Sequence, residues 1–170
     1  MRRGVAASRG RWVLVSDADL STPIEELETL ESYRDRADFI LGSRASRGSR
    51  ITRRQPLFRV LMGKTFNLII RSLGLSDLHD TQCGFKLMRG EETRRVFSLA
   101  RVDGFAFDVE TVWLARALGL RVIEVGVIWN DSPGSTVHPI RDSADMLWDV
   151  VKLRLRRRPR VERGSSRIRV

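Results

Sequence analysis

Short apolar runs along this chain alternate with stretches in which apolar residues recur every third or fourth position. The runs have the composition of buried strands, and the spaced stretches have the period of amphipathic helices. Strands are predicted at Trp12–Ser16, Asp38–Gly42, Gly84–Met88 and Arg121–Trp129. Helices are predicted at Arg2–Ser8, Leu57–Leu73, Glu91–Leu99, Asp108–Leu118 and Arg141–Arg156, with one more between the first two strands. This alternation favours an α/β fold with a sheet flanked by helices.

The segment between the first two predicted strands carries the signals of a helix start. Thr22 is placed to cap the helix together with Glu25, and Pro23 occupies the first helical position. Apolar residues at every third position extend this helix to about Arg36. A strand, a helix and a second strand form a β-α-β unit, so we expect the two strands to pair in parallel through a right-handed crossover.

The region after the second strand is strongly basic. Residues 43–56 carry five arginines and no acid, and Gly48 with three serines predicts a loop. The last predicted helix carries an apolar stripe that includes Trp148 and Leu155 and runs into a basic segment. The stripe suits either packing against the sheet or lying at a membrane interface.

Composition supports one folded domain. The chain has 170 residues, of which 42% are hydrophobic, and this is enough for a proper core. The single cysteine, Cys83, excludes a disulfide framework and is interpreted as a small buried residue. No apolar stretch in the sequence is long enough to cross a bilayer.

The net charge of +10 is unevenly distributed. Residues 152–170 carry nine Lys/Arg and one acid, which leaves a net charge of only +2 for residues 1–151. We therefore expect a domain over residues 1–155 and a basic, disordered tail over residues 156–170. The nearly neutral body argues against a nucleic-acid-binding module. The tail suits an anionic lipid surface, or it stays solvated without a partner.

Two carboxylates, Asp17 and Asp19, directly follow the first predicted strand. Ligands of open α/β sheets bind beyond the carboxyl ends of strands, and Mg²⁺ is usually held by one or two carboxylates plus substrate phosphates. The pair therefore predicts a metal site. The alternative is a strand-to-helix turn with a capping aspartate.

Five separated segments together resemble one family. They are Ser16–Pro23, Gly42–Arg44, Asp80–Lys86, Gly104–Glu110, and Trp129–Asp131 with Gly134–Ser135. In this order and spacing they resemble family-two glycosyltransferases that charge a polyprenyl phosphate. The likeness is greatest to the dolichyl-phosphate β-glucosyltransferase type and next to the mannose-transferring type. It covers residues 1 to about 155.

The resemblance implies a Rossmann-like glycosyltransferase A fold with a mixed sheet flanked by helices. It also implies inverting transfer of a sugar from a nucleotide-sugar donor to a polyprenyl or dolichyl phosphate, assisted by Mg²⁺ or Mn²⁺. UDP-glucose is the expected donor, with a GDP-mannose-dependent transferase or an inactive fragment as alternatives. The protein is expected to be cytoplasmic and peripheral on the cytoplasmic membrane face.

The family motif also implies roles on the donor side. Asp19 is the candidate for direct metal contact, and Asp17 contacts the metal or the donor. Gln82 and Lys86 match the motif that contacts the sugar or the diphosphate. For Lys86, the alternative is a solvent-exposed charge on an edge strand.

The acceptor is a phosphate that is already ionised, so the enzyme must mainly position it and offset charge repulsion. Arginine suits this task because its guanidinium binds phosphate oxygens with two parallel hydrogen bonds. The candidates are Arg44, Arg47, Arg50 and Arg53, with Arg54 beside them. The alternative is a solvated basic loop.

The resemblance makes Asp108 the candidate for orienting the acceptor or acting as a base. Asp108 and Glu110 lie at a predicted helix start, where the helix dipole alone favours carboxylates. Trp129 is interpreted as a core residue in preference to a sugar platform.

The family begins with a further strand, carrying a Pro-Ala-Tyr-Asn-Glu-like motif, and a β-α-β stretch that cradles the nucleotide. A β-α-β unit takes about 30 residues. We therefore expect this chain to lack at least that much, through a wrongly assigned start at Met1 or a true truncation. Strand Trp12–Ser16 would then expose an apolar edge. The chain alone is expected to be poorly soluble and to bind the donor weakly or not at all.

Overall fold

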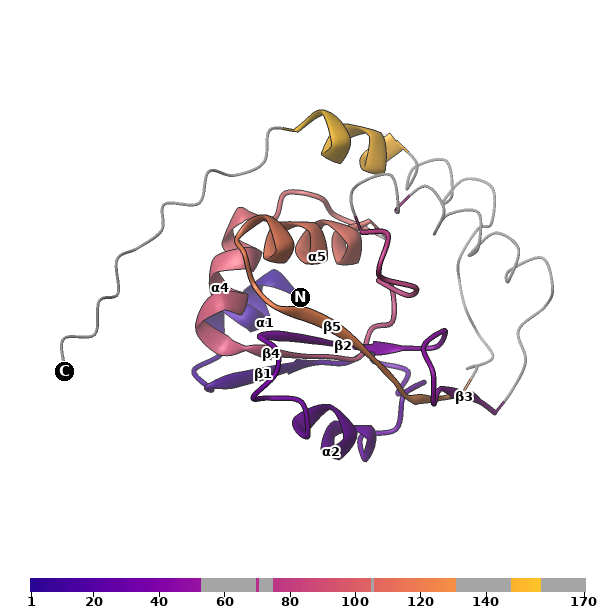
Figure 1. Cartoon of the computed structure of the whole chain (residues 1–170). Coiled ribbons are helices and arrows are strands. Elements are labelled where there is room, and N and C mark those ends of the chain that lie inside the picture. The colour runs from indigo at the N-terminus through magenta and orange to yellow at the C-terminus, as the bar shows by residue number, and fades with distance from the viewer. Residues whose placement is uncertain (53–69, 71–74, 105, 131–147, 157–170) are drawn as a thin grey trace.

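The computed structural model describes residues 1–52, 70, 75–104, 106–130 and 148–156 (Figure 1). The helices are α1 (Arg2–Ala7), α2 (Glu26–Glu31), α4 (Gly90–Leu99) and α5 (Phe107–Ala117), with a further helical segment at 148–155. The strands are β1 (Trp12–Val15), β2 (Phe39–Ser43), β3 (Arg50–Ile51), β4 (Lys86–Arg89), β5 (Val122–Gly126) and β6 (Ile128–Trp129). The predicted helix Leu57–Leu73, apart from Ile70, the turn after Asn130, and residues 157–170 of the predicted tail lie outside the described residues.

Four strands form a mixed sheet in the order β1-β4-β2-β5, which confirms the predicted α/β class. Strand β4 runs antiparallel to both β1 and β2, and β2 runs parallel to β5. The expectation that the first two strands pair directly is wrong, because β4 lies between them. Strands β1 and β2 do run in the same direction, since each is antiparallel to β4.

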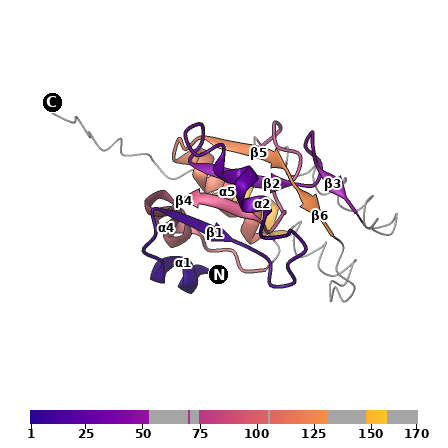
Figure 2. The ribbon, with the colours of Figure 1, turned by 90° about the horizontal axis from the view of Figure 1, so that it is seen from below.

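Helices cover both faces of this sheet. Helices α1, α4 and α5 share one core with Phe39, Leu41 and Met88, whereas the residues around α2 share the other core with Ile40 and Leu87. Figure 1 shows α5 and α2 on opposite sides of the sheet. In Figure 2, which views the molecule from below, α2 lies in front of the strands. Because successive strand residues alternate between the two cores, β2 and β4 are buried on both faces.

Helix α2 is shorter than predicted, and the expected capping pair does not form. No side chain caps its first turn, and the amides of Glu26 and Leu27 instead bond three residues back, to Pro23 and Ile24. After Glu31 the chain again makes bonds of this tighter kind. Thr22 is buried. The helical region therefore ends in 3₁₀-like turns on both sides.

The last predicted strand, Arg121–Trp129, is divided into β5 and β6. Strand β6 pairs in parallel with β3, a short strand inside the segment that the sequence predicts to be a loop. The loop before β3 folds onto Gly126, where an added Cβ would lie 2.5 Å from the amide nitrogen of Ser49. Glycine is therefore required at position 126 for this close backbone approach.

Candidate active site

Four charged side chains gather at one edge of the sheet. Asp17 follows the end of β1, Arg44 follows the end of β2, and Lys86 opens the antiparallel strand β4. Asp108 comes from the first turn of α5. These elements bring to one place residues that the sequence separates by up to 91 positions. Ligands of open α/β sheets bind beyond the carboxyl ends of strands, so this cluster is the candidate site.

The Asp17 carboxylate lies directly against Gly84. A Cβ added at Gly84 would lie 2.0 Å from the Asp17 Oδ2 atom, so a side chain at position 84 would displace the carboxylate. Desolvation raises the pKa of Asp17, and the negative charges of Asp108 and Asp19 raise it further, whereas Lys86 opposes the shift. Burial is therefore the main cause of the raised pKa of Asp17, and Lys86 offsets part of the effect of its two acidic neighbours.

The turn that follows β1 holds the two aspartates in a fixed arrangement. The Ser21 amide donates to Asp19 Oδ1 at 3.0 Å, and the Leu20 amide donates to the Asp17 carbonyl at 3.2 Å. Leu20 has a positive φ of 52°, a left-handed conformation that is costly for a residue with a side chain. The Asn130 amide, just after β6, donates to the Ser21 carbonyl at 2.7 Å and ties the turn to the second sheet.

Lys86 and Asp108 form an ion pair at the centre of the site. The Lys86 Nζ atom lies 2.6 Å from Asp108 Oδ1 and also donates to the Cys83 carbonyl at 2.5 Å. Lys86 is 2% exposed on a strand with neighbours on both sides, so its interpretation as an exposed edge-strand charge is wrong. The Asp108 side chain remains partly exposed.

Arg44 binds a carboxylate of the protein itself. Its Nε and Nη2 atoms each lie 2.7 Å from an oxygen of Asp80, and its backbone amide donates to Asp80 Oδ2 at 2.9 Å. The guanidinium also lies 5.5 Å from the ring centroid of Trp129, which is buried as predicted. Burial would raise the pKa of Asp80, but the hydrogen bonds and charge of Arg44 lower it overall. Arg44 therefore has a structural partner in addition to its predicted role toward phosphate.

Glu124 fixes the loop that carries Asp80, and sequence reasoning missed both residues. Its carboxylate accepts the backbone amides of His79, at 2.8 Å, and of Asp80, and the Ser46 hydroxyl at 3.1 Å. In the sequence, Glu124 lies on the more polar face of a predicted strand, where it looks like a solvated surface acid. A carboxylate with a side chain only 5% exposed needs several donors, and these amides supply them.

The other predicted residues are less central. The backbone N–H of Gln82 donates to Asp80 Oδ1 at 3.3 Å, which places this residue next to the Arg44–Asp80 pair. Arg47 and Arg50 are exposed on the loop before β3 and on β3 itself, and Arg53 lies outside the described residues. The described part of the chain does not gather these arginines around Asp17.

Glu110 has a structural role that separates it from Asp108. It is fully buried and accepts the amides of Arg101 and Val102 at 2.8 and 2.7 Å. Its other oxygen lies 2.5 Å from Arg156 Nη1, at the end of the helical segment 148–155. Asp108 faces the site, so it is the acidic residue of this pair that is positioned to meet a ligand.

The carboxylates at this edge fit a cation only with help from a ligand. Among the described residues, no three His, Cys, Asp or Glu side chains are grouped closely enough to hold a metal ion. Asp17 and Asp19 are both exposed, and they leave coordination positions for other oxygens. This is the arrangement in which Mg²⁺ is held by one or two carboxylates together with substrate phosphates.

The helical segment 148–155 has two apolar faces. Val150 and Leu153 are buried against the core, whereas Trp148 and Leu155 are 62% and 80% exposed. The described members of the predicted stripe, Trp148, Val151 and Leu155, are all exposed, and the residues that pack on the core lie outside that stripe. Within the described ranges, no helix has the length and hydropathy to span a bilayer.

Comparison with known proteins identifies relatives of one kind, although no protein-family model matches the chain. The chain is 32% identical over 162 residues to dolichyl-phosphate β-glucosyltransferase of Dictyostelium discoideum and 32% identical over 163 residues to that of Homo sapiens. Each match covers 92% of this chain and 50% of the relative. The protein of the same name from Saccharomyces cerevisiae is 26% identical over 168 residues. The chain thus spans about half the length of the curated relatives it matches, and over nine-tenths of its own length it is similar in sequence to dolichyl-phosphate β-glucosyltransferases.

Proposed function

We propose that this chain forms the catalytic part of a glycosyltransferase that moves glucose from UDP-glucose to a polyprenyl or dolichyl phosphate with inversion at the anomeric carbon. The observation that carries the proposal is the cluster in which Asp17 lies against Gly84 beside the buried Lys86–Asp108 pair. The names of the relatives support the sugar and the acceptor.

The donor diphosphate binds on the Asp17 side of the cluster. Asp17 and Asp19 would hold Mg²⁺ or Mn²⁺ together with diphosphate oxygens, and such an ion neutralises negative charge as the leaving group departs. A cation would offset the cost of holding the Asp17 carboxylate ionised in this position, where burial is the main cause of its raised pKa. Lys86 adds a fixed positive charge at the same edge.

The acceptor phosphate binds on the Asp108 side. One of its oxygens attacks the anomeric carbon as the bond between that carbon and the diphosphate oxygen breaks, and the electron pair leaves with UDP. No proton has to be removed from an ionised phosphate, so positioning is the main requirement. Asp108, itself oriented by Lys86, fixes the geometry of this approach, and Arg44 offsets the phosphate charge from the neighbouring strand end.

The helical segment 148–155 brings the site to the membrane that carries the lipid acceptor. Trp148 and Leu155 are exposed apolar side chains, with Lys152 and Arg154 between them. Apolar side chains flanked by basic ones are typical of helices that lie in a membrane interface. We expect this segment to rest on the cytoplasmic face as a peripheral anchor.

The transfer reaction is tested on the chain extended to the length of its relatives, because the chain alone spans about half of that length and is expected to bind the donor weakly or not at all. The assay supplies labelled UDP-glucose or GDP-mannose, polyprenyl phosphate and Mg²⁺, with and without excess chelator. We expect transfer from UDP-glucose that is lost in chelator and in the double variant D17N/D19N. The matched control D35N/D103N removes two exposed carboxylates elsewhere and should retain activity. Full turnover of D17N/D19N, or transfer from GDP-mannose alone, would contradict the proposal.

Membrane attachment is tested separately by sedimentation with vesicles that contain anionic lipid. Replacing Trp148 and Leu155 by serine should weaken binding at least tenfold, since each buried apolar side chain contributes about 1.5–3 kcal/mol. The control replaces Ile24 and Ile51, which are also exposed but lie on other elements. Equal binding by both double variants would exclude this helix as the anchor.

A further inference from the structure

The helical segment 148–155 is joined to the first turn of α5 through the guanidinium group of Arg156. Its Nη1 atom lies 2.5 Å from the carboxylate of Glu110, and its Nη2 atom donates at 3.1 Å to the carbonyl of Leu99, the last residue of α4. Glu110 is fully buried, so a loss of the arginine would leave its charge without this partner. The attachment of the segment and the order of α5 are therefore linked.

The same carboxylate holds the loop that leads into α5. Glu110 Oε2 accepts the backbone N–H groups of Arg101 and Val102 at 2.8 and 2.7 Å. The first turn of α5 also presents Asp108, which binds Lys86 in the candidate site. One buried acid thus fixes the start of the helix that carries a site residue, and the helical segment supplies a further donor to that acid.

The segment is attached to the body through few apolar side chains. Of its described residues, only Val150 and Leu153 are buried. A cavity of about 390 Å³ remains where the segment meets the loop 101–103. Elements with few buried apolar contacts are the first to open locally. The attachment of the segment therefore depends on the contact of Arg156 with Glu110 as well as on the two buried side chains.

The outer face of the segment is formed only while the segment is helical. Trp148, Val151 and Leu155 are exposed, and spacings of three and four residues align them on one face of a helix. A membrane interface binds an aligned apolar face better than an unwound chain, whose apolar side chains point in several directions. Membrane contact therefore favours the helical state, and this state brings Arg156 to Glu110.

These contacts connect the outer face of the segment to the acceptor side of the candidate site. We propose that membrane contact through the segment 148–155 orders the first turn of α5, by way of the Arg156–Glu110 pair, and so positions Asp108 for the lipid phosphate. Arg156 and Glu110 are positioning residues, because they act through α5. The inference rests on the proposed function, in which the segment is the membrane anchor. Linkage makes the effect reciprocal, so weakening the pair must also weaken membrane binding.

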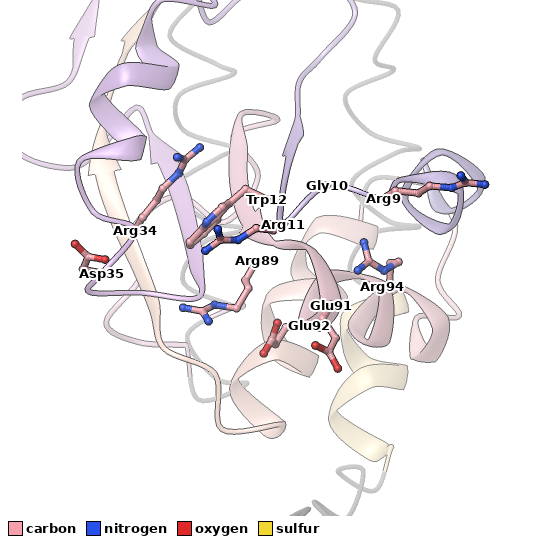
Figure 3. A pocket seen from close by; sticks show the side chains of 10 residues that line it. All are labelled: Arg9, Gly10, Arg11, Trp12, Arg34, Asp35, Arg89, Glu91, Glu92 and Arg94. Carbon is pink, nitrogen blue, oxygen red and sulfur yellow. The ribbon is translucent and has the colours of Figure 1, made fainter. Parts of the chain in front are cut away.

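Sedimentation with vesicles that contain anionic lipid tests this reciprocity in the variant E110Q. Glu110 is buried beyond contact with a vesicle, and electrostatics alone would make the loss of a negative charge strengthen binding to an anionic surface. We expect the opposite, a vesicle affinity at least about fivefold lower than that of the parent. The matched control E91Q removes an exposed carboxylate from the first turn of α4, at the other end of that helix from Leu99 (Figure 3). This control should bind at least as tightly as the parent, and circular dichroism checks that both variants fold.

Hydrogen exchange of the unaltered chain gives a second test that needs no variant. Anionic vesicles should slow the exchange of the Arg101 and Val102 amides, which the buried carboxylate accepts, by at least about fivefold. The reference is the amide of Ser32, at the end of α2 on the opposite face of the sheet, and its exchange should not change. Equal slowing at all three amides would show general adsorption and overturn the inference.

The transfer assay on the extended chain separates positioning from a general effect on folding. On vesicles, E110Q should raise the KM for the polyprenyl phosphate and leave the KM for UDP-glucose unchanged, because Asp108 is assigned to the acceptor side. An equal rise in both constants would show a general effect and overturn the inference.

Failure of this inference is distinguishable from failure of the proposed function. If the parent binds vesicles but E110Q binds them equally well or more tightly, or if vesicles do not slow exchange at Arg101 and Val102, only this inference is overturned. If the parent does not bind vesicles, the membrane anchor of the proposed function is wrong, and the inference fails with it.

Discussion

Replacing Asp80 by asparagine tests whether the Arg44–Asp80 pair holds the active-site edge together. The change removes the charge that receives both guanidinium hydrogen bonds and leaves Arg44 beside Trp129 without a carboxylate. Breaking a buried pair costs about 3–5 kcal/mol. Asp80 is 8% exposed but the Arg44 side chain is 29% exposed, so the lower end, about 3 kcal/mol, applies here.

The assay is urea unfolding followed by circular dichroism, with a thermal melt beside it. A loss of about 3 kcal/mol corresponds to a melting temperature lower by roughly 6–12 °C in a protein of this size. The control D77N breaks the surface pair of Asp77 with Arg116 and should cost at most about 1 kcal/mol. A D80N variant as stable as D77N would refute the reasoning.

The same variant has a predictable dependence on pH. The pKa of Asp80 is lowered in the folded state, mainly through its bonds to Arg44. A lowered pKa contributes stability that is present above the unfolded value, about 3.9, and that is lost as the pH falls through the folded value. The stability difference between parent and D80N should therefore be full at pH 7 and shrink below about pH 4. A difference that is constant down to pH 2 would contradict the assigned ion pair.

Three further changes test the site and its support. In G84A the new methyl group should rotate the Asp17 carboxylate, so that transferase activity falls while the melting temperature changes little. The double variant D17N/G84A should lose no more activity than D17N. D17N itself should raise the melting temperature at pH 7, because the raised pKa of Asp17 means that its ionised carboxylate opposes folding. This gain in melting temperature should vanish below about pH 3.9. A melting temperature of D17N below that of the parent at pH 7 would contradict the reasoning. E110Q should lower the free energy of unfolding in urea by about 3 kcal/mol, because it removes the buried charge that pairs with Arg156. The control E91Q, at an exposed position, should lower it little. Equal losses in the two variants would refute the structural role of Glu110.

The strand and helix positions were predictable because they depend on local patterns, but the order of the strands was not. The sequence places a helix between β1 and β2, and this favours direct pairing. The structure instead inserts β4, whose Leu87 and Met88 are buried on opposite faces. Apolar residues on both faces are typical of a central strand, so the sequence of β4 already indicated that it lies inside the sheet. Which strands become its neighbours depends on contacts distant in the sequence.

The same distinction applies to the site. The position of Asp17 and Asp19 just after a strand was predictable, because the apolar run that forms the strand directly precedes them in the sequence. Asp80 and Glu124 were not, since the partners of Asp80 lie 36 residues earlier, at Arg44, and 44 residues later, at Glu124. In a sequence, a buried carboxylate that orders backbone amides looks the same as a solvated surface acid. Only the fold reveals that these carboxylates have structural partners.

The left-handed Leu20 has a consequence for how a cation is recognised. A non-glycine residue in this conformation costs about 1–2 kcal/mol, and the surrounding hydrogen bonds of Asp17, Asp19 and Ser21 hold it there. The spacing of the two acidic groups is therefore set during folding, before any ion arrives, so association needs little reorganisation of the backbone. A glycine at position 20 would relieve the backbone strain, but the turn would then adopt more conformations and the distance between Asp17 and Asp19 would vary more.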